Sequence, residues 1–416
     1  MIAMRSLTAK FFLGIFLTLS NIYCEETITW GGYTISAKSK DKDLFPNFNA
    51  LKEKMAPMQY QLVETIDKPY LLSPRGLAST GQTKSIVVAF DKERITGGKL
   101  GDVCLWQYTI TAQVILFELE GMNVLQTHPV GRSRNYVEQD VSSCTAEKRD
   151  KERDRFRFCQ IFLGLETDEN YSKAEVQNNC DNITLINSGN GLMKEIGYVV
   201  SNLGISEKKN IRFAGIGNIS MTDRAKAILS GKEDFISHPF FTNESGFDEQ
   251  SYKDWISQYF AKTISSTLSV PLVVPFAGSV GGKVQLKYSD GTAIDLTLPE
   301  LDYSFDISIR GFAKSLMDET PKREAWVYGS YITMDFGGLI SKQSSKVKNG
   351  YVLETVKGDF INDWREFDNS IKELAKEYAR QIEKTERKWI PQQTNMKYRE
   401  GKKYFEYIKE ILEQVK

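Results

Sequence analysis

Histidine is the scarcest reactive side chain in this sequence, and its scarcity excludes one class of site. The chain has 416 residues but only two histidines and five cysteines. A metal centre built on several histidine ligands cannot form within one such chain. The 54 basic side chains are balanced by 54 acidic ones, so no general attraction to nucleic acid is expected. With 41% hydrophobic residues, the composition is that of an ordinary globular protein.

Two glycine-rich segments fall short of nucleotide-binding motifs. Gly215 and Gly217 begin a G-x-G-x-x-G pattern, but Ser220 occupies the third glycine position. The segment from Ala277 to Lys283 lacks the first glycine of a phosphate loop, and Val284 replaces the Ser or Thr that would hold magnesium. We interpret the first as a strand-to-helix turn and the second as a turn into a strand. A nucleotide-dependent enzyme using Gly215 and Gly217 is the least favoured class, and we predict no cofactor.

No catalytic constellation can be selected from the remaining residues. The chain has neither a G-x-S-x-G elbow nor an H-E-x-x-H motif. His128 and His238 both precede proline and are interpreted as turn or hydrogen-bonding residues. Acidic pairs such as Asp302 and Asp306 could serve a glycosidase, which needs two carboxylates about 5–10 Å apart. Because any choice among 54 acidic residues is arbitrary, we name no catalytic residue and no metal ligand.

The N-terminus has the pattern of a secretory signal. Arg5 and Lys10 provide positive charge, and an apolar stretch from Phe11 to Tyr23 is shorter than the roughly 20 residues that span a bilayer. The acidic pair after Cys24 completes the pattern. We therefore predict a signal peptide over residues 1–24 and an exported, periplasmic or secreted protein. Its removal leaves 52 basic and 54 acidic side chains, and no later segment is apolar enough to cross a membrane.

If the protein is exported, its cysteines are expected to form disulfides. Cys104, Cys144, Cys159 and Cys180 remain after loss of the signal, and all four lie in the first half. An even number of cysteines in an exported chain predicts disulfides. Their spacing lacks the paired C-x-x-C pattern of zinc sites, and no histidine is adjacent. The sequence leaves three pairings open, and the alternative of four buried thiols in a cytosolic protein depends on the signal peptide.

Hydrophobic periodicity predicts an α+β fold of two strand-rich modules, with mainly antiparallel sheets and packed amphipathic helices. We expect a first domain over residues 25–230, containing the four cysteines, and a second over residues 231–416. Strands are expected at 86–90, 106–119 and 326–336, and helices at 192–203, 252–268 and near both 371–382 and 404–415. A short helix from Asn47 should end before Pro57. The charged segment from Glu147 to Arg157 alternates in sign and is interpreted as solvated.

A hairpin in the second half has a predictable register. If Ser289 to Gly291 forms a three-residue loop, Leu286 opposes Ile294 and Val284 opposes Leu296. A two-residue loop would set Leu286 against Asp295, so the three-residue loop keeps the apolar side chains on one face.

Short matches recur in the same order across the two halves. The segment from Lys68 to Pro74 resembles that from Val270 to Pro275, each after a helix, and Leu105-Trp-Gln-Tyr108 resembles Ala325-Trp-Val-Tyr328. A third match links residues 135–140 to residues 351–355. These matches indicate either a divergent tandem duplication or a coincidence between two strand-rich regions.

The function expected from these observations is that of an exported, soluble, non-enzymatic protein that binds or scaffolds protein or glycan partners of the cell envelope or exterior. The alternative is an exported carboxylate-based hydrolase acting on glycans or another envelope polymer, whose site would be invisible in one sequence. No nucleic-acid partner is expected.

Overall fold

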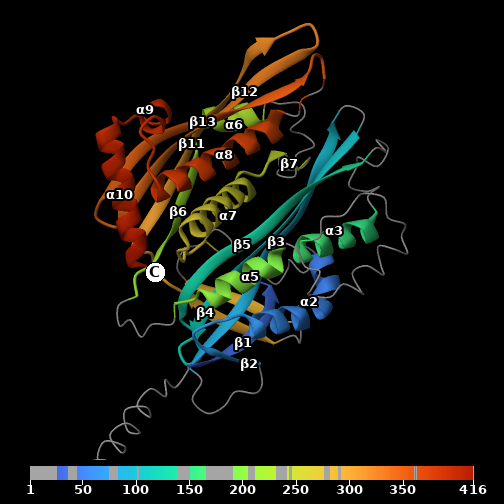
Figure 1. Ribbon diagram of the computed structural model, residues 1–416, viewed down its shortest axis with the longest axis vertical. Coiled ribbons are helices and arrows are strands. Elements are labelled where there is room, and N and C mark those ends of the chain that lie inside the picture. The colour runs from blue at the N-terminus through green and yellow to red at the C-terminus, as the bar shows by residue number, and fades with distance from the viewer. Residues whose placement is uncertain are drawn as a thin grey trace, which may run out of the picture.

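The computed structural model describes residues 26–35, 45–74, 83–100, 103–138, 150–164, 191–204, 211–230, 241–242, 246–275, 282–288, 292–359, 361 and 363–415. Within these ranges the chain forms eight helices, two large sheets and one two-stranded ribbon of β7 (Phe241–Thr242) and β8 (Gly246–Phe247). The predicted α+β class is confirmed (Figure 1). None of the described helices is long and apolar enough to cross a membrane.

The first sheet has the strand order β10-β9-β1-β3-β4-β5. Its members are β1 (Thr27–Ile35), β3 (Lys84–Leu100), β4 (Val103–Glu118), β5 (Val124–Glu138), β9 (Gly282–Tyr288) and β10 (Ala293–Leu298), with β2 (Leu71–Pro74) beside β1. At one end the sheet curls until its outermost strands meet. There the Thr297 N–H of β10 donates to the Met122 carbonyl at 2.8 Å, just before β5. The curl encloses a cluster of apolar side chains that includes Val87, Phe117 and Leu286.

Three helices cover the other face of this sheet: α2 (Pro46–Thr65), α3 (Lys151–Leu163) and α5 (Leu192–Ser201). The expectation that α2 ends before Pro57 is wrong, because the helix continues through this proline. The buried residues Phe48, Leu51, Met55 and Val63 lie on both sides of Pro57, so packing against the sheet sustains the helix where the proline removes a backbone donor.

The second sheet has the order β13-β12-β11-β6. Its strands are β6 (Ala214–Met221), β11 (Tyr303–Glu319), β12 (Arg323–Gly338) and β13 (Lys342–Val356). The helices of this half are α6 (Asp223–Ser230), α7 (Glu249–Leu268), α8 (Asp363–Glu383), α9 (Trp389–Gln393) and α10 (Tyr398–Gln414). The two C-terminal helices pack on the second sheet. Tyr404 of α10 meets Tyr378 of α8 at 2.9 Å between hydroxyls and donates to the Met334 carbonyl of β12 at 3.3 Å.

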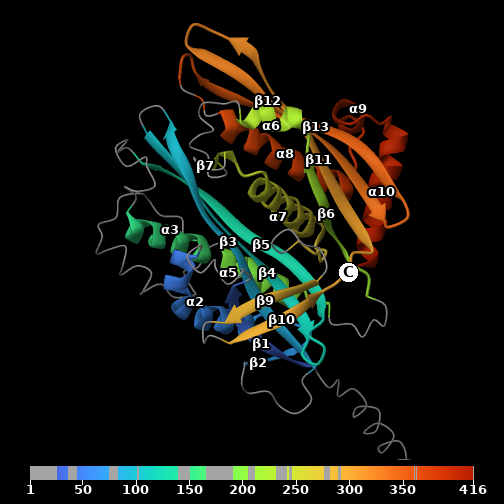
Figure 2. The same ribbon diagram turned by 180° about the vertical axis from the view of Figure 1, so that it is seen from behind.

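The two sheets exchange strands across the expected domain boundary at residues 230 and 231. The hairpin β9–β10 follows the boundary but pairs with β1 in the first sheet, whereas β6 precedes the boundary and pairs with β11 in the second. Figure 2 shows this hairpin lying with the strands of the first half. Its register is the predicted one, because Leu286 pairs with Ile294 and Val284 with Leu296. The loop at 289–291 lies outside the described residues, and the division into two domains stays a prediction.

The two halves repeat one order of elements. In each half a first strand precedes a helix of 20 residues, and three antiparallel strands of 17, 16 and 15 residues come later. Additional elements interrupt this order: β2 in the first half, and α6, β7, β8, β9 and β10 in the second. The first strand runs parallel to the first of these three, β1 with β3 and β6 with β11. Both β3 and β11 have a bulge after their seventh residue, next to Phe90 and Ile309 respectively. The sequence matches between the halves therefore coincide with matching structure.

Candidate functional site

One face of the first sheet changes from apolar to polar along its length. Beyond the bulge, the register aligns Lys92 with Thr111 and Gly131, and Arg94 with Thr109 and Ser133. The next pair is Gln107 with Asn135. We call these eight residues the polar face. Because directly paired residues share a side of the sheet, their side chains form one continuous surface.

The bulge marks where this change occurs. Asp91, next to the bulge, accepts hydrogen bonds from the Thr111 hydroxyl and, at 3.3 Å, from the Gln113 side chain. Burial is the main cause that raises the pKa of the Asp91 carboxyl, and these two hydrogen bonds oppose it. A bulge re-aims the side chains that follow it. The bulge thus fixes Lys92 and Arg94 on the same side as the hydroxyls of β4.

Two helices of the second half lie opposite the polar face. Lys372 of α8 donates to the Gln107 side chain at 3.3 Å, which joins α8 directly to β4. The same Lys372 nitrogen lies 5.6 Å from the centre of the Trp255 ring on α7. Helix α7 also packs against β5, as both ribbon views show (Figures 1 and 2). We call this region, where the polar face meets α7 and α8, the junction.

Charges of both signs meet at the junction, where Lys92 and Arg94 are half-buried. Burial lowers the pKa of Lys92 to about 8, with Arg94 adding to the effect and Asp254, Asp91 and Asp248 opposing it. Burial also lowers the pKa of Arg94 to about 9, against the attraction of Asp368 and Asp248. Desolvated cations interact more strongly with an anion than cations in water do.

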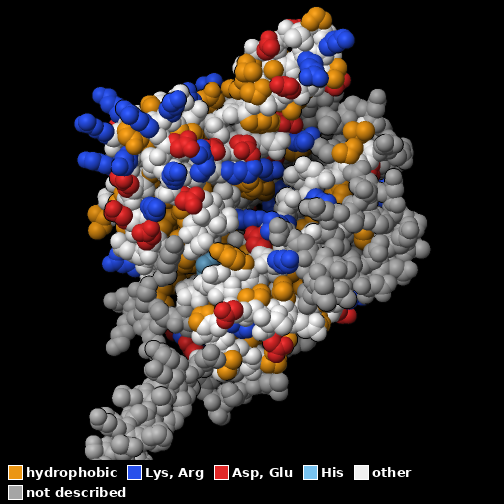
Figure 3. All heavy atoms as spheres, in the orientation of Figure 1, with side chains coloured by type: hydrophobic (Ala, Val, Ile, Leu, Met, Phe, Trp, Pro, Cys, Tyr) orange, Lys and Arg blue, Asp and Glu red, His pale blue; other side chains and the backbone are white. Residues whose placement is uncertain are grey.

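The junction remains open to solvent over part of the polar face. The Thr109 and Ser133 hydroxyls lie 2.7 Å apart, and the Gln107 amide donates to Asn135 at 3.1 Å, both in exposed positions. Figure 3 shows Lys and Arg side chains gathered along a hollow between the two halves. Paired hydroxyl and amide groups at an exposed site offer donors and acceptors to a polar ligand.

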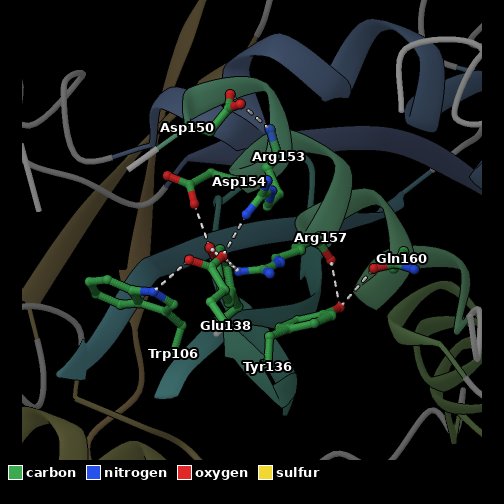
Figure 4. A network of polar contacts seen from close by, with 9 residues as sticks. Trp106, Tyr136, Glu138, Asp150, Arg153, Asp154, Arg157 and Gln160 are labelled. Atoms are coloured by element: carbon green, nitrogen blue, oxygen red, sulfur yellow. Dashed lines mark hydrogen bonds and ion pairs between the residues drawn. The ribbon is translucent and has the colours of Figure 1, made fainter. Parts of the chain in front are cut away.

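A buried polar network holds the same strand ends from the opposite side of the sheet (Figure 4). The Arg157 guanidinium of α3 lies 2.7 Å from Glu138 of β5 and donates to the Tyr108 hydroxyl of β4 at 3.0 Å. The Tyr108 hydroxyl in turn donates to Asp154. The Trp106 indole donates to Glu138 at 3.2 Å. Each member therefore has a partner, and the network clamps α3 onto β4 and β5 directly behind the polar face.

The segment ending at Arg157 was interpreted as a solvated loop or helix, and it forms a helix whose Lys151, Glu152, Arg153 and Arg155 are exposed, whereas Asp154 and Arg157 depart from the expectation. The side chains of Asp154 and Arg157 are buried, and Asp150 caps the helix by accepting from the Glu152 and Arg153 amides. Burial is possible because Arg157 also stacks on two rings, with its guanidinium carbon 4.5 Å from the Tyr136 centroid and 5.2 Å from that of Tyr108. Residues 147–149 lie outside the described residues.

The acidic residues that the sequence offered for hydrolysis are engaged with the backbone. Asp302 accepts from the Phe213 amide at 2.7 Å, and Asp306 accepts from the Asn218 amide at 3.0 Å and pairs with Lys342. His128 lies on β5, where burial lowers its pKa to about 4. Its Nε2 atom is buried and finds no hydrogen-bond partner in the described part of the chain. His238 lies outside the described residues.

The first glycine segment is a strand, not the predicted strand-to-helix turn. Gly215 and Gly217 lie within β6, in parallel pairing with β11. A side chain on Gly215 would strike the Val273 carbonyl at 2.3 Å, and one on Gly217 would strike Asp306 at 2.2 Å. Close packing therefore accounts for both glycines. The helix that follows begins at Asp223, where the Thr222 hydroxyl accepts from the Ala225 amide at 3.2 Å. The second segment lies mainly outside the described residues, and β9 begins at Gly282.

Two cysteines of the first half lie near this network. Cys104 is the second residue of β4 and Cys159 lies on α3, and both are buried in the same apolar cluster. Cys144 and Cys180 lie outside the described residues, so the predicted pairing of the four cysteines stays a prediction.

The described residues bring together no group of three or more His, Cys, Asp or Glu side chains that could hold a metal ion. Comparison with models of protein families and with curated proteins finds no match. The site is therefore argued from its residues alone.

Sequence reasoning missed the residues of the junction. Lys92 and Arg94 occur in a strand that begins apolar, and nothing in the local pattern brings Lys372 near Gln107, 265 residues away. One signal was present in the sequence. The odd-numbered residues of β4 from Gln107 to Gln113 are all polar, as they are on a strand with one wet face.

Proposed function

We propose that the protein is exported to the periplasm or the cell exterior and acts there as a non-enzymatic binding or scaffold protein, with its ligand bound at the junction. The polar face is the observation that carries the proposal. It combines exposed hydroxyl and amide groups with two desolvated cations, and it is faced by Lys372 and Trp255 from the other half. Hydroxyls, amides, charges and an aromatic ring together suit a polar ligand such as a glycan or a peptide.

The location between the halves supports the same proposal. Ligand sites occur preferentially where two structural layers meet, because each layer contributes groups that a single layer could not bring together. Here β3, β4 and β5 supply the polar face, while α7 and α8 supply the aromatic ring and the third cation. The buried network around Arg157 fixes the strand ends behind the site, so its geometry is set before a ligand arrives.

Filling the junction tests the proposal. Ser133 is exposed at the centre of the polar face, so Ser133→Tyr should obstruct a ligand without disturbing the core. The control is Thr297→Tyr, on an exposed position of β10 in the same sheet. The mature protein is titrated calorimetrically with neutral and acidic oligosaccharides and with peptides. We expect a binder whose affinity falls at least about tenfold in Ser133→Tyr and is unchanged in Thr297→Tyr. An affinity that is unchanged in Ser133→Tyr, or the absence of binding by every probe, would refute the proposed site.

A further inference from the structure

The second sheet has exposed residues on the side away from its core. Side chains on β11, β12 and β13 alternate between the buried core and this outer side. The register aligns Ala313 with Gly329 and Gly350, and the next row aligns Ser315 with Val327 and Val352. We call these two rows the outer patch. No side chain in it is charged or larger than valine.

The outer patch is exposed and partly apolar. Val352 is 47% exposed, and Val356, four residues further along the same side of β13, is 58% exposed. Gly350, Ala313 and Ser315 are also exposed. Small side chains allow another sheet to approach to about 10 Å, the spacing at which sheets pack face to face.

On β13, charge is arranged symmetrically about the patch. On one side the flanking row contains Tyr331 and Lys348, and on the other side it contains Asp318, Ala325 and Glu354. Lys348 and Glu354 are both exposed on β13, three residues before and three residues after Tyr351. The centre of the patch thus lies midway between a cation and a carboxylate.

The corresponding surface of the first half is already covered by helices. The matching strands β3, β4 and β5 present the polar face on the same side of their bulge, and α7 and α8 lie against it. In the second half, the equivalent positions carry small and apolar residues in place of Arg94, Gln107 and Asn135. A sheet face of this kind that is left exposed indicates an interaction surface.

We propose that the outer patch is the interface of a homodimer, formed face to face with a second copy of this chain. A two-fold axis that lies between the two sheets and crosses the strands midway along the patch sets each β13 antiparallel to its counterpart. That operation places Lys348 against Glu354 of the partner subunit, and Glu354 against the partner subunit's Lys348. An isologous contact of this kind requires a self-complementary surface, and the symmetric charges provide one.

A second copy is the occupant that these charges favour. An unrelated partner would have to carry a carboxylate and a cation at this same spacing, whereas a second copy turned about the two-fold axis carries both. The proposal concerns assembly and is independent of the ligand at the junction.

Sedimentation velocity of the mature protein, from about 1 to about 100 μM, tests the interface, because that range resolves micromolar dimers. The wild type should show a concentration-dependent dimer. Val352→Arg should give a monomer, since it places an unpaired charge at the centre of the interface. Ile340→Arg is the matched control, because Ile340 is a fully exposed apolar residue in the turn after β12, away from the patch.

A charge reversal distinguishes this geometry from other dimers. Lys348→Glu and Glu354→Lys should each weaken dimerisation at least about fivefold, and the double variant should restore it. All these residues are exposed, and unchanged melting temperatures verify that the variants fold. A monomeric wild type at the highest concentration would overturn the proposal. So would a dimer that tolerates Val352→Arg, or a double variant that is no better than the single ones.

Discussion

At the residue scale, Arg157 shows most clearly how context decides the value of a charge. Its side chain is 5% exposed and Glu138, its acceptor, is 12% exposed, whereas Arg153 reaches the same carboxylate from a position that is 45% exposed. Arg157→Met should lower the free energy of unfolding by about 3–5 kcal/mol, because it removes the buried cation that pairs with Glu138 and bonds Tyr108. Arg153→Met should change it by less than about 1 kcal/mol. Urea denaturation at pH 7 measures both, and equal losses would show that the network is not the clamp described above.

His128 gives the protein a specific weakness toward acid. Burial holds the pKa of its imidazole at about 4, below the ordinary value of 6.5. Between these two pH values the unfolded chain takes up a proton that the folded protein refuses, so stability is lost as the pH falls from 6.5 to 4. His128→Gln cannot titrate and should show a shallower loss of melting temperature over this window. Parallel pH profiles for the two proteins would contradict the burial of the imidazole.

These residues also show why sequence reasoning stops at this scale. Charges of alternating sign from Glu147 to Arg157 predict a solvated segment. The burial of Asp154 and Arg157 was missed, because composition does not reveal which charges meet rings and carboxylates from other strands. The two residues that form each contact are far apart in the sequence, as Tyr108 and Asp154 are. Local patterns predict side-chain direction, and only tertiary pairing supplies the partner.

At the scale of elements, one clasp occurs in both halves. Tyr108 of β4 bonds Asp154 of α3 and packs on Phe158, with ring centres 5.5 Å apart. Tyr328 of β12 bonds Asp363 of α8 at 2.5 Å and packs on Phe367, again with ring centres 5.5 Å apart. In both helices the phenylalanine follows the aspartate by four residues. Together with the equal strand lengths and bulges, this supports a divergent tandem duplication as our interpretation of the repeat.

If the clasps are equivalent, they should stabilise the protein equally. Tyr108→Phe and Tyr328→Phe each leave a buried carboxylate without one donor, at an expected cost of about 1–3 kcal/mol in the free energy of unfolding. Tyr198→Phe, on a residue that is 59% exposed, is the control and should be near neutral. Chemical denaturation compares the three, and a cost confined to one clasp would argue against equivalent roles.

The C-terminal helix is part of the fold, and truncation should show it. Tyr404, Phe405 and Ile408 of α10 are buried in the main core of the second half. Removing residues 392–416 should therefore expose the face of α8 that they cover and lower the melting temperature by several degrees, since each kcal/mol lost shifts it by about 2–4 °C in a unit of 150–250 residues. A normal melting temperature would mean that α10 is dispensable for folding.

Helices and strands were predictable from the sequence where the residues of the segment itself determine its structure. The apolar stripes of α5, α7, α8 and α10 and the alternation in β4 and β12 are visible in the sequence, because one face of each is buried. The helix through Pro57 and the strand at Gly215 were missed, since tertiary packing outweighs local preference in both. The hairpin register of β9–β10 was predictable because turn and alternation agree.

At the scale of the whole molecule, the exchange of strands limits how far the halves can be separated. Without β9 and β10, the first half would expose Val87, Ala89, Ile115 and Phe117, which now pack inside the curl. We therefore expect residues 25–230 expressed alone to aggregate or to lack a cooperative unfolding transition. Co-expression with residues 231–416 should restore a soluble complex. A cooperative transition in the isolated fragment would support the predicted domain boundary and contradict this expectation.

The membership of β9 and β10 in the first sheet could not be predicted from the sequence. A strand carries its alternation in its own residues, but its choice of neighbour depends on where the rest of the chain has brought a free edge. Thr34 of β1 and Tyr288 of β9 are paired across more than half of the chain. The fold class was therefore readable from the sequence, whereas the connection of the halves and the junction between them were not.

The curl of the first sheet also determines when this sheet can be completed during synthesis of the chain. β1 is synthesised near the start of the chain, but the strand that covers its edge, β9, is made about 250 residues later. At a translation rate of about 5–20 residues per second, that edge waits for roughly ten seconds or more after it emerges. Pairings of such long sequence separation also form slowly, because the intervening chain must lose its freedom first. The nascent first half would thus depend on a holding chaperone, or on delayed collapse, until residue 298 has left the ribosome.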